Sequence, residues 1–247
     1  MKTPASRTTP RFFAPIELPL GAEIRLPERA ARHCTVLRLQ RGDAITLFNG
    51  QGGEFTAELT QSSSANALAR VLSAHVPQRE SPLAIALAQC VSAGDRMDTA
   101  LQKSTELGVS KIIPVASERS VVKLSGERAE KRAAHWRNVV IAACEQCGRN
   151  RIPEVTAITD ILDFLSSAPG NGMRLLLAPD SGQNLKQLAP PREVTLLIGP
   201  EGGLTERERE DAERAGFLPI RFGPRVLRTE TAPLAAIAAM QSLWGDC

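Results

Sequence analysis

Tyrosine is absent from this chain, and aromatic residues make up only 4% of its 247 residues. No run of about 18 apolar residues, the length of a membrane-spanning helix, is present. The start, Met1-Lys2-Thr3-Pro4, lacks the apolar core of a secretion signal. We therefore expect a cytoplasmic protein that has no membrane partner and offers few rings on which nucleobases could stack.

Cysteine is also scarce, since the chain has five cysteines at scattered positions, too few for a disulfide scaffold. Cys144 and Cys147 form a C-x-x-C pair, a spacing that can bind zinc or serve redox chemistry. They fall in an expected helix that ends at Gly148, and no second C-x-x-C or H-x-x-x-H completes a ligand set. We expect no metal site and interpret both as ordinary helical cysteines, with zinc or redox chemistry as the alternative.

Positive charge is concentrated at one end of the chain. Residues 1–77 hold nine Lys or Arg against six Asp or Glu, which accounts for the whole net charge of +3. A local basic surface is what binding to a phosphate backbone requires, although a solvated face is the alternative.

The rhythm of apolar residues changes near residue 78. Before it, short β-like runs broken by turns, with one helix expected over 28–38, predict a small β-barrel. After it, apolar strands alternate with helices, which predicts an α/β domain with a mostly parallel sheet. We expect domains at 1–77 and 78–247. In the second domain we expect strands at 83–89, 112–115, 174–178, 194–199 and 218–222, and helices at 96–107, 127–147, 206–215 and a last one to 244.

Two Gly/Pro turns follow expected strands of the second domain. The first is Gly199-Pro200-Glu201-Gly202-Gly203, and the second, Gly223-Pro224-Arg225, leads into Arg228-Thr229-Glu230-Thr231. Neither matches the G-x-x-x-x-G-K-[ST] or G-x-G-x-x-G pattern. Parallel sheets bind ligands beyond the carboxyl ends of their strands, and glycine lets a ligand approach the backbone closely. The turns therefore predict a ligand pocket lined largely by backbone, on neighbouring strands.

The two turns and four further motifs resemble the RsmE family of 16S ribosomal RNA uracil-N3 methyltransferases, within the SPOUT superfamily. The further motifs lie at residues 94–97, 102–109, 117–120 and 145–149. The resemblance is dense over the last 170 residues and extends weakly to 11–13 and 36–38. One departure is that Ser92-Ala93 stands where the family has a lysine before Gly94-Asp95.

This resemblance implies a fold and partners. It implies a PUA-like RNA-binding β-barrel over 1–77 and, over 78–247, an α/β domain tied in a trefoil knot, which the general rule against knots would not have predicted. It implies a homodimer packed through the knots, S-adenosylmethionine as cofactor, and 16S ribosomal RNA of the small subunit as partner. The residues it places around the cofactor are Leu177, Ala178, Ile198, Gly199, Pro200, Glu201, Gly202, Phe222, Gly223, Val226, Leu227 and Arg228.

Methylation of uracil N3 requires loss of the imide proton, because only the deprotonated nitrogen has a lone pair to offer. A cation near the uracil oxygens lowers that cost, and a general base assists further. We assign Arg228 as the cation and Glu230 as the base, both catalytic. The alternative is a salt bridge between Arg228 and Glu230 that only fixes the loop.

N3 lies on the pairing edge of uracil, so the target base must be unpaired. We expect Arg11, Phe12, Arg32, Arg38 and Arg225 to hold the RNA through phosphate contacts and limited stacking. The competing interpretation is a non-catalytic RNA-binding protein. A nucleotide-binding hydrolase would lack its lysine loop and an acidic metal-binding set.

Overall fold

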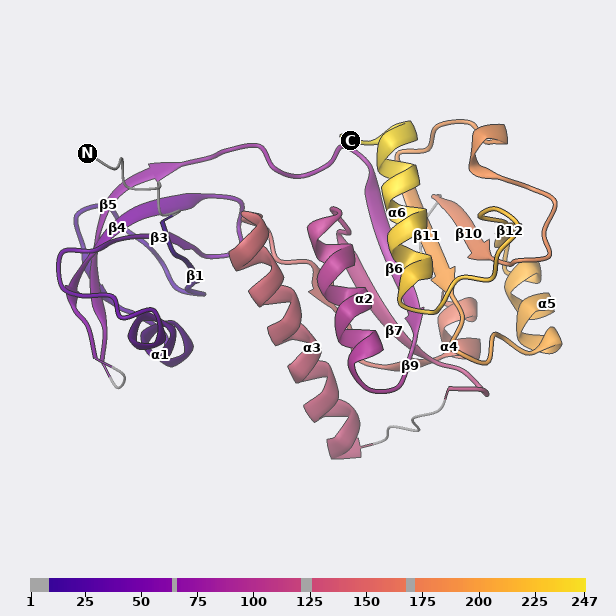
Figure 1. Cartoon of the computed structure of the whole chain (residues 1–247), viewed down its shortest axis with the longest axis horizontal. Helices are drawn as coiled ribbons and strands as arrows, with labels where there is room; N and C mark the ends of the chain where they lie inside the picture. Colours follow the sequence, from indigo (N-terminus) through magenta and orange to yellow (C-terminus); the bar gives the residue numbers. More distant parts are fainter. Residues whose placement is uncertain (1–8, 64–65, 121–125, 168–171) are drawn as a thin grey trace, which may run out of the picture. The chain divides into compact units, whose positions relative to one another are not determined.

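The computed structural model describes residues 9–63, 66–120, 126–167 and 172–247 (Figure 1). Residues 1–4, on which the expectation of no secretion signal rests, lie outside this part. Contacts divide the chain into two compact units, residues 1–80 with 144–152 and residues 81–143 with 153–247. The sequence did not predict that segment 144–152 belongs to the first unit.

The first unit is built on a five-stranded sheet with the order β1-β3-β4-β5-β2. Strand β1 pairs with β3 in parallel, and the remaining neighbours are antiparallel. The elements are β1 (Arg11–Phe13), β2 (Glu23–Arg25), α1 (Glu28–Val36), β3 (Ala44–Phe48), β4 (Glu54–Gln61) and β5 (Leu68–His75). Helix α1 ends before the expected residue 38, because Arg38 adopts a positive φ of 57°.

The core of this unit follows from strand alternation. Ile45 and Leu47 of β3 point to one side of the sheet and are fully buried, as are Ala57 and Leu59 of β4. Phe12 of β1 is in the same cluster, together with the apolar face of α1. Burial of the Phe12 side chain in this core therefore holds the short strand β1 in place.

The second unit contains a seven-stranded sheet with the order β12-β10-β11-β6-β7-β8, and β9 also pairs with β7. All of these pairs are parallel, as the sequence predicted for this part. The strands are β6 (Ala84–Cys90), β7 (Lys111–Ala116), β8 (Glu154–Val155), β9 (Thr159–Asp160), β10 (Met173–Leu177), β11 (Glu193–Ile198) and β12 (Leu218–Ile220).

Helices cover both faces of this sheet. Adjacent residues Leu87 and Ala88 of β6 point to opposite faces, and both are fully buried. Helix α2 packs against α6, and α4 packs against α5 (Figure 1). The helices are α2 (Asp95–Glu106), α3 (Gly126–Cys147), α4 (Ile161–Ser166), a 3₁₀ turn η1 (Leu185–Gln187), α5 (Glu206–Arg214) and α6 (Thr231–Trp244).

The sheet order corrects one expectation. The two Gly/Pro turns follow β11 and β12, which are not neighbours, because β10 lies between them. Parallel pairing of β10 with both strands still places the three carboxyl ends at one edge, with Leu177 paired to Ile220. In the described part of the chain, no helix is both long and apolar enough to cross a membrane.

Candidate active site

A cavity of about 510 Å³ opens at this edge of the sheet, within the second unit. Most of the residues expected around a cofactor line it: Leu177, Ala178, Ile198, Gly199, Pro200, Glu201, Phe222, Val226, Leu227 and Arg228. Gly202 and Gly223, which were also predicted, do not line it. The sequence analysis missed as cavity residues Arg96, Leu176, Pro179, Gly203, Leu204, Arg209, Thr229 and Ala232.

The loop after β11 forms one wall of the cavity, and it packs closely around Gly199. A Cβ atom on Gly199 would lie 3.3 Å from the backbone nitrogen of Leu204, a contact that requires this backbone to shift slightly. The loop closes through a bond from Gly203 N to Pro200 O of 2.9 Å and then enters α5. The predicted capping box is confirmed: Thr205 Oγ1 accepts from Glu208 N, and Glu208 Oε2 accepts from Thr205 N.

The same loop is braced from its outer side. Arg119 donates to Gly202 O at 3.1 Å, and a Cβ on Gly202 would lie 3.4 Å from Arg119 Cβ. The buried carboxylate of Glu208 also accepts from Glu118 N at 2.8 Å. The Cβ position of Gly202 therefore faces the brace, and its predicted contact with the cofactor stays a prediction.

Glu201 clamps this loop to the segment after β6. Its Oε1 accepts from Ala93 N at 2.9 Å and from Arg96 at 3.1 Å. Burial by itself would raise the pKa of Glu201, but the amide of Ala93 and the guanidinium of Arg96 outweigh burial and lower it. Glu201 is thus held as a carboxylate on the cavity wall.

The loop after β12 supplies an opposite wall that is charged at its rim. Arg225 and Arg228 are exposed and line the cavity, and Val226 between them is 80% exposed. In the described residues neither arginine has a carboxylate within salt-bridge distance. Arg209, by contrast, is paired with Asp180 at 2.8 Å. The rim therefore presents two cations that are available to an anionic ligand.

Glu230 lies at the inner end of this loop and lines the cavity. Its Oε2 atom is buried and has no hydrogen-bond partner. Within the part of the chain that the structure describes, no salt bridge joins it to Arg228. The alternative role in which the two residues only fix the loop through an ion pair is therefore not supported by the geometry.

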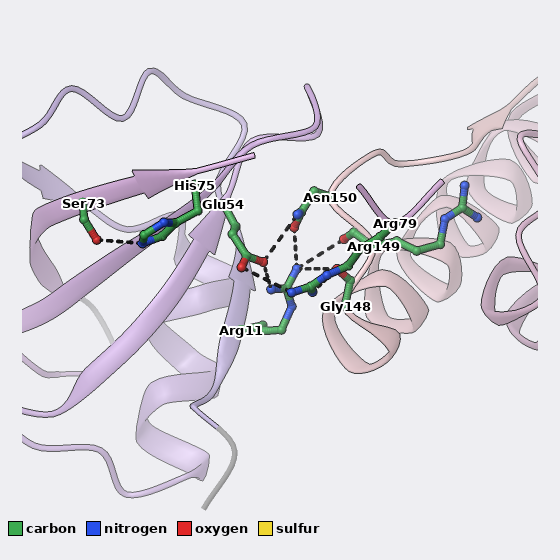
Figure 2. Close-up of polar contacts among 8 residues, drawn as sticks. All are labelled: Arg11, Glu54, Ser73, His75, Arg79, Gly148, Arg149 and Asn150. Carbon is green, nitrogen blue, oxygen red and sulfur yellow. Dashed lines mark hydrogen bonds and ion pairs between the residues drawn. The ribbon is translucent and has the colours of Figure 1, made fainter. Parts of the chain in front are cut away.

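In the first unit, the structure contradicts two of the RNA-binding predictions. Phe12 is 0% exposed and packs edge-on against His33, so its ring has no face free for a base. Arg11 donates to Glu54 at 2.7 Å and to Asn150 at 2.6 Å, with its side chain 13% exposed (Figure 2). Both predictions were wrong because burial and internal pairing take up the groups that would bind RNA.

Arg32 and Arg38 differ from Arg11 in being exposed. Arg32 is paired only loosely with Glu28, at 3.6 Å on the same helix face, where ion pairs contribute little. Arg38 follows α1 with its side chain in solvent. These two positions can therefore reach an external phosphate.

The C-x-x-C pair has the structure of ordinary helical cysteines. Burial raises the pKa of Cys144 to about 12, which disfavours the thiolate that metal binding and redox chemistry need. Its Sγ faces Arg151 O at 3.7 Å. No group of three His, Cys, Asp or Glu side chains able to hold a metal occurs in the described residues.

Known proteins are similar to this chain in both sequence and fold. Residues 79–241 match the model of a family described as an RNA methyltransferase domain, and residues 26–72 match an RNA methyltransferase PUA domain. Ribosomal RNA small subunit methyltransferase E of Buchnera aphidicola is 35% identical over 96% of this chain and 97% of its own.

Two solved structures extend the similarity to three dimensions. The methyltransferase E of Neisseria gonorrhoeae, bound to S-adenosylmethionine, is 46% identical with a TM-score of 0.91, covering 97% of this chain and 99% of its own. A Legionella pneumophila methyltransferase, also holding S-adenosylmethionine, is 40% identical with a TM-score of 0.95, covering 98% and 100%. The chain belongs to the family of ribosomal RNA small subunit methyltransferase E proteins.

Proposed function

We propose that this protein is an S-adenosylmethionine-dependent methyltransferase that modifies N3 of a uridine in 16S ribosomal RNA of the small subunit. The observation that supports it most is the cavity at the carboxyl ends of β10, β11 and β12, in a chain similar along its whole length to methyltransferases that bind S-adenosylmethionine. A protein that only binds RNA has no use for such a cavity.

The cavity lining fits the cofactor. Leu177, Ile198 and Leu227 offer apolar contact, and Gly199 has no side chain that would cover its backbone. Pockets for such ligands combine an apolar lining with a few placed polar groups. When bound, S-adenosylmethionine supplies a methyl group activated by the sulfonium. Glu201, held as a carboxylate on the cavity wall, is the polar group that we assign to cofactor binding.

Catalysis falls to Arg228 and Glu230. Arg228 lines the cavity without a carboxylate partner, so its charge is available to the uracil oxygens as N3 loses its proton. We assign Glu230 as the acceptor of that proton, which its buried and unpartnered Oε2 supports. The cavity must also hold the deprotonated N3 in line with the methyl group of the cofactor, because this alignment lowers the barrier to transfer.

RNA is held outside the cavity. Arg225 at the rim binds a phosphate next to the target nucleotide, and Arg32 and Arg38 of the N-terminal domain, residues 1–77, bind further phosphates. The target uridine is unpaired, because N3 lies on the pairing edge and must be free of a pairing partner to react. Arg11 and Phe12 are not part of this surface.

The resemblance to the SPOUT superfamily supports three further proposals. The domain over 78–247 is tied in a trefoil knot, two subunits associate through their knots into a homodimer, and the enzyme acts in the cytoplasm, where ribosomal subunits are assembled. Light scattering on the purified protein tests the homodimer. A monomer at micromolar concentration would contradict it.

Two measurements test the function. Titration calorimetry with S-adenosylmethionine should show saturable binding, and the absence of binding to folded protein would favour the RNA-binding alternative. Transfer of labelled methyl groups to unmodified 16S RNA, free and in small subunits, should then yield 3-methyluridine after digestion. Label on another base, or on a ribose, would overturn the N3 assignment but would leave the proposed methyltransferase activity standing.

A further inference from the structure

One buried hydroxyl joins three segments that surround the cavity. Thr229 is 7% exposed, and its Oγ1 lies 3.0 Å from Gly199 O in the loop after β11. The same atom lies 3.2 Å from Gln89 Nε2 in β6 and 3.1 Å from Ser92 Oγ just after that strand. Gln89 and Ser92 are themselves 0% and 2% exposed. The end of β6, the loop after β11 (residues 199–203, called the cofactor loop below) and the loop before α6 thus meet at Thr229 Oγ1.

Two bonds in this network have a defined direction, those that join Thr229 to Gly199 and to Gln89. Gly199 O can only accept, so the one hydroxyl proton of Thr229 points to it. Gln89 Nε2 lies 3.2 Å from Cys90 O, another obligate acceptor, which fixes the amide with its nitrogen toward both Cys90 O and Thr229. Removal of the hydroxyl would therefore leave the part-buried carbonyl of Gly199 and a buried N–H of Gln89 without their partner.

Thr229 also stands between the two residues assigned to catalysis. Arg228 and Glu230 are its chain neighbours, and all three line the cavity. A tether from Thr229 to Gly199 O fixes where these neighbours stand relative to the cofactor loop. We propose that Thr229 is a positioning residue that couples Arg228 and Glu230 to the cofactor loop through its hydroxyl; this rests on the proposed function.

Substitutions can separate the hydroxyl from the shape of the side chain. Thr229→Val keeps the branched shape and removes the hydroxyl, whereas Thr229→Ser keeps the hydroxyl and removes the methyl. Thr105→Val is the matched control, because Thr105 is a fully buried threonine of α2 whose hydroxyl donates to Leu101 O at 2.8 Å and which does not line the cavity.

Single-turnover methyl transfer at saturating cofactor and RNA gives the main readout. We expect Thr229→Val to lose about a hundredfold in rate, on the scale of an active group displaced by about 1 Å. Thr229→Ser should recover most of that rate, and Thr105→Val should keep it. The proposal is overturned if Thr229→Val reacts like the wild type, if serine gives no recovery, or if Thr105→Val loses as much.

A second measurement does not depend on activity. Hydrogen exchange of the amides in 223–230 should be faster in Thr229→Val than in wild type and should return to normal in Thr229→Ser. Equal exchange in all three overturns the tether. A wild type that transfers no methyl group overturns the proposed function alone. If Thr229→Val does not fold, Thr229→Ala removes the same hydroxyl and is measured in its place, and unchanged rate and exchange in that variant overturn the proposal.

Discussion

The Arg11 guanidinium donates to the Glu54 carboxylate across 2.7 Å, and the two side chains are only 13% and 17% exposed. Glu54 also pairs with Arg79 at 3.3 Å, and Arg11 donates to Gly148 O at 3.0 Å (Figure 2). Residues far apart in the sequence are thus joined inside the first unit. Arg11 holds this unit together, which makes its contribution one of stability.

Glu54→Gln should test this pair through its pH dependence. Burial would raise the pKa of Glu54, but the hydrogen bond from Arg11 and the charge of Arg79 bring it below its ordinary value of 4.5. The carboxylate therefore stabilises the fold fully above pH 4.5, and this contribution disappears as the pH falls through the lower folded pKa.

We expect Glu54→Gln to lower the free energy of unfolding near neutral pH by about 2 kcal/mol, the scale of a charged hydrogen bond. Its stability should also fall less than that of the wild type as the pH drops below 4.5. Urea unfolding at a series of pH values measures both effects. Glu58→Gln, exposed on the same strand, is the control, and equal curves for all three proteins would contradict the role of the pair.

Gly199 and Gly202 should differ in their effect on cofactor binding. Gly199 lines the cavity, and a Cβ there would lie in tight contact with Leu204 N, so the branched side chain of Gly199→Val should weaken S-adenosylmethionine binding about tenfold or more through overpacking of the loop. Gly202→Ala places its Cβ in ordinary contact with Arg119, away from the cavity, and should bind normally. Titration calorimetry measures both affinities. Weaker binding by Gly202→Ala than by Gly199→Val would refute the assignment of Gly199 to the cofactor-binding wall of the cavity.

The catalytic assignment predicts two different kinetic defects. Arg228→Ala should slow single-turnover methyl transfer about a hundredfold, as when one charge-stabilising donor is lost. Glu230→Gln should be slowest at low pH and should recover as rising pH deprotonates N3 without help. Rates against pH at saturating cofactor and RNA measure both. A Glu230→Gln profile parallel to that of wild type would eliminate the base role.

The arrangement of the second unit was largely readable from the sequence. Its strands and helices alternate along the chain, and Thr205 with Glu208 marks the start of α5 by local chemistry alone. The order of the strands was not readable, because the apolar runs of β10, β11 and β12 resemble one another and carry no sign of which pairs with which. For that reason the two turns were expected on neighbouring strands.

The errors in the first unit have one physical cause. A sequence shows that Arg11 is charged and Phe12 aromatic, but not that Glu54 and Asn150, 43 and 139 positions away, supply partners for the arginine. Burial of Phe12 likewise depends on the parallel pairing of β1 with β3, which no local sequence pattern predicts. Where exposure decided the role, as for Arg32 and Arg38, the RNA-binding predictions remain open to test.

Arg38 stands at a helix end where glycine is usual. Leu39 N bonds to Cys34 O at 2.9 Å and Arg38 N to Thr35 O at 3.0 Å, the pairing that ends a helix through a left-handed residue. Helices α2 and α5 end in the same pairing with Gly108 and Gly216 at that position. In the described part of the chain, Arg38 is the only residue other than glycine with positive φ.

Arg38→Gly should therefore separate folding from RNA binding. Relief of the left-handed strain should raise the free energy of unfolding by up to about 1 kcal/mol, with part of the gain offset by the added freedom of the unfolded chain. Loss of the cation should weaken RNA binding and reduce the slope of log affinity against log salt by about one. Arg38→Lys, which keeps the charge, should retain that slope. A glycine variant that is more stable and binds RNA as tightly as the wild type would show that Arg38 is only a solvated charge.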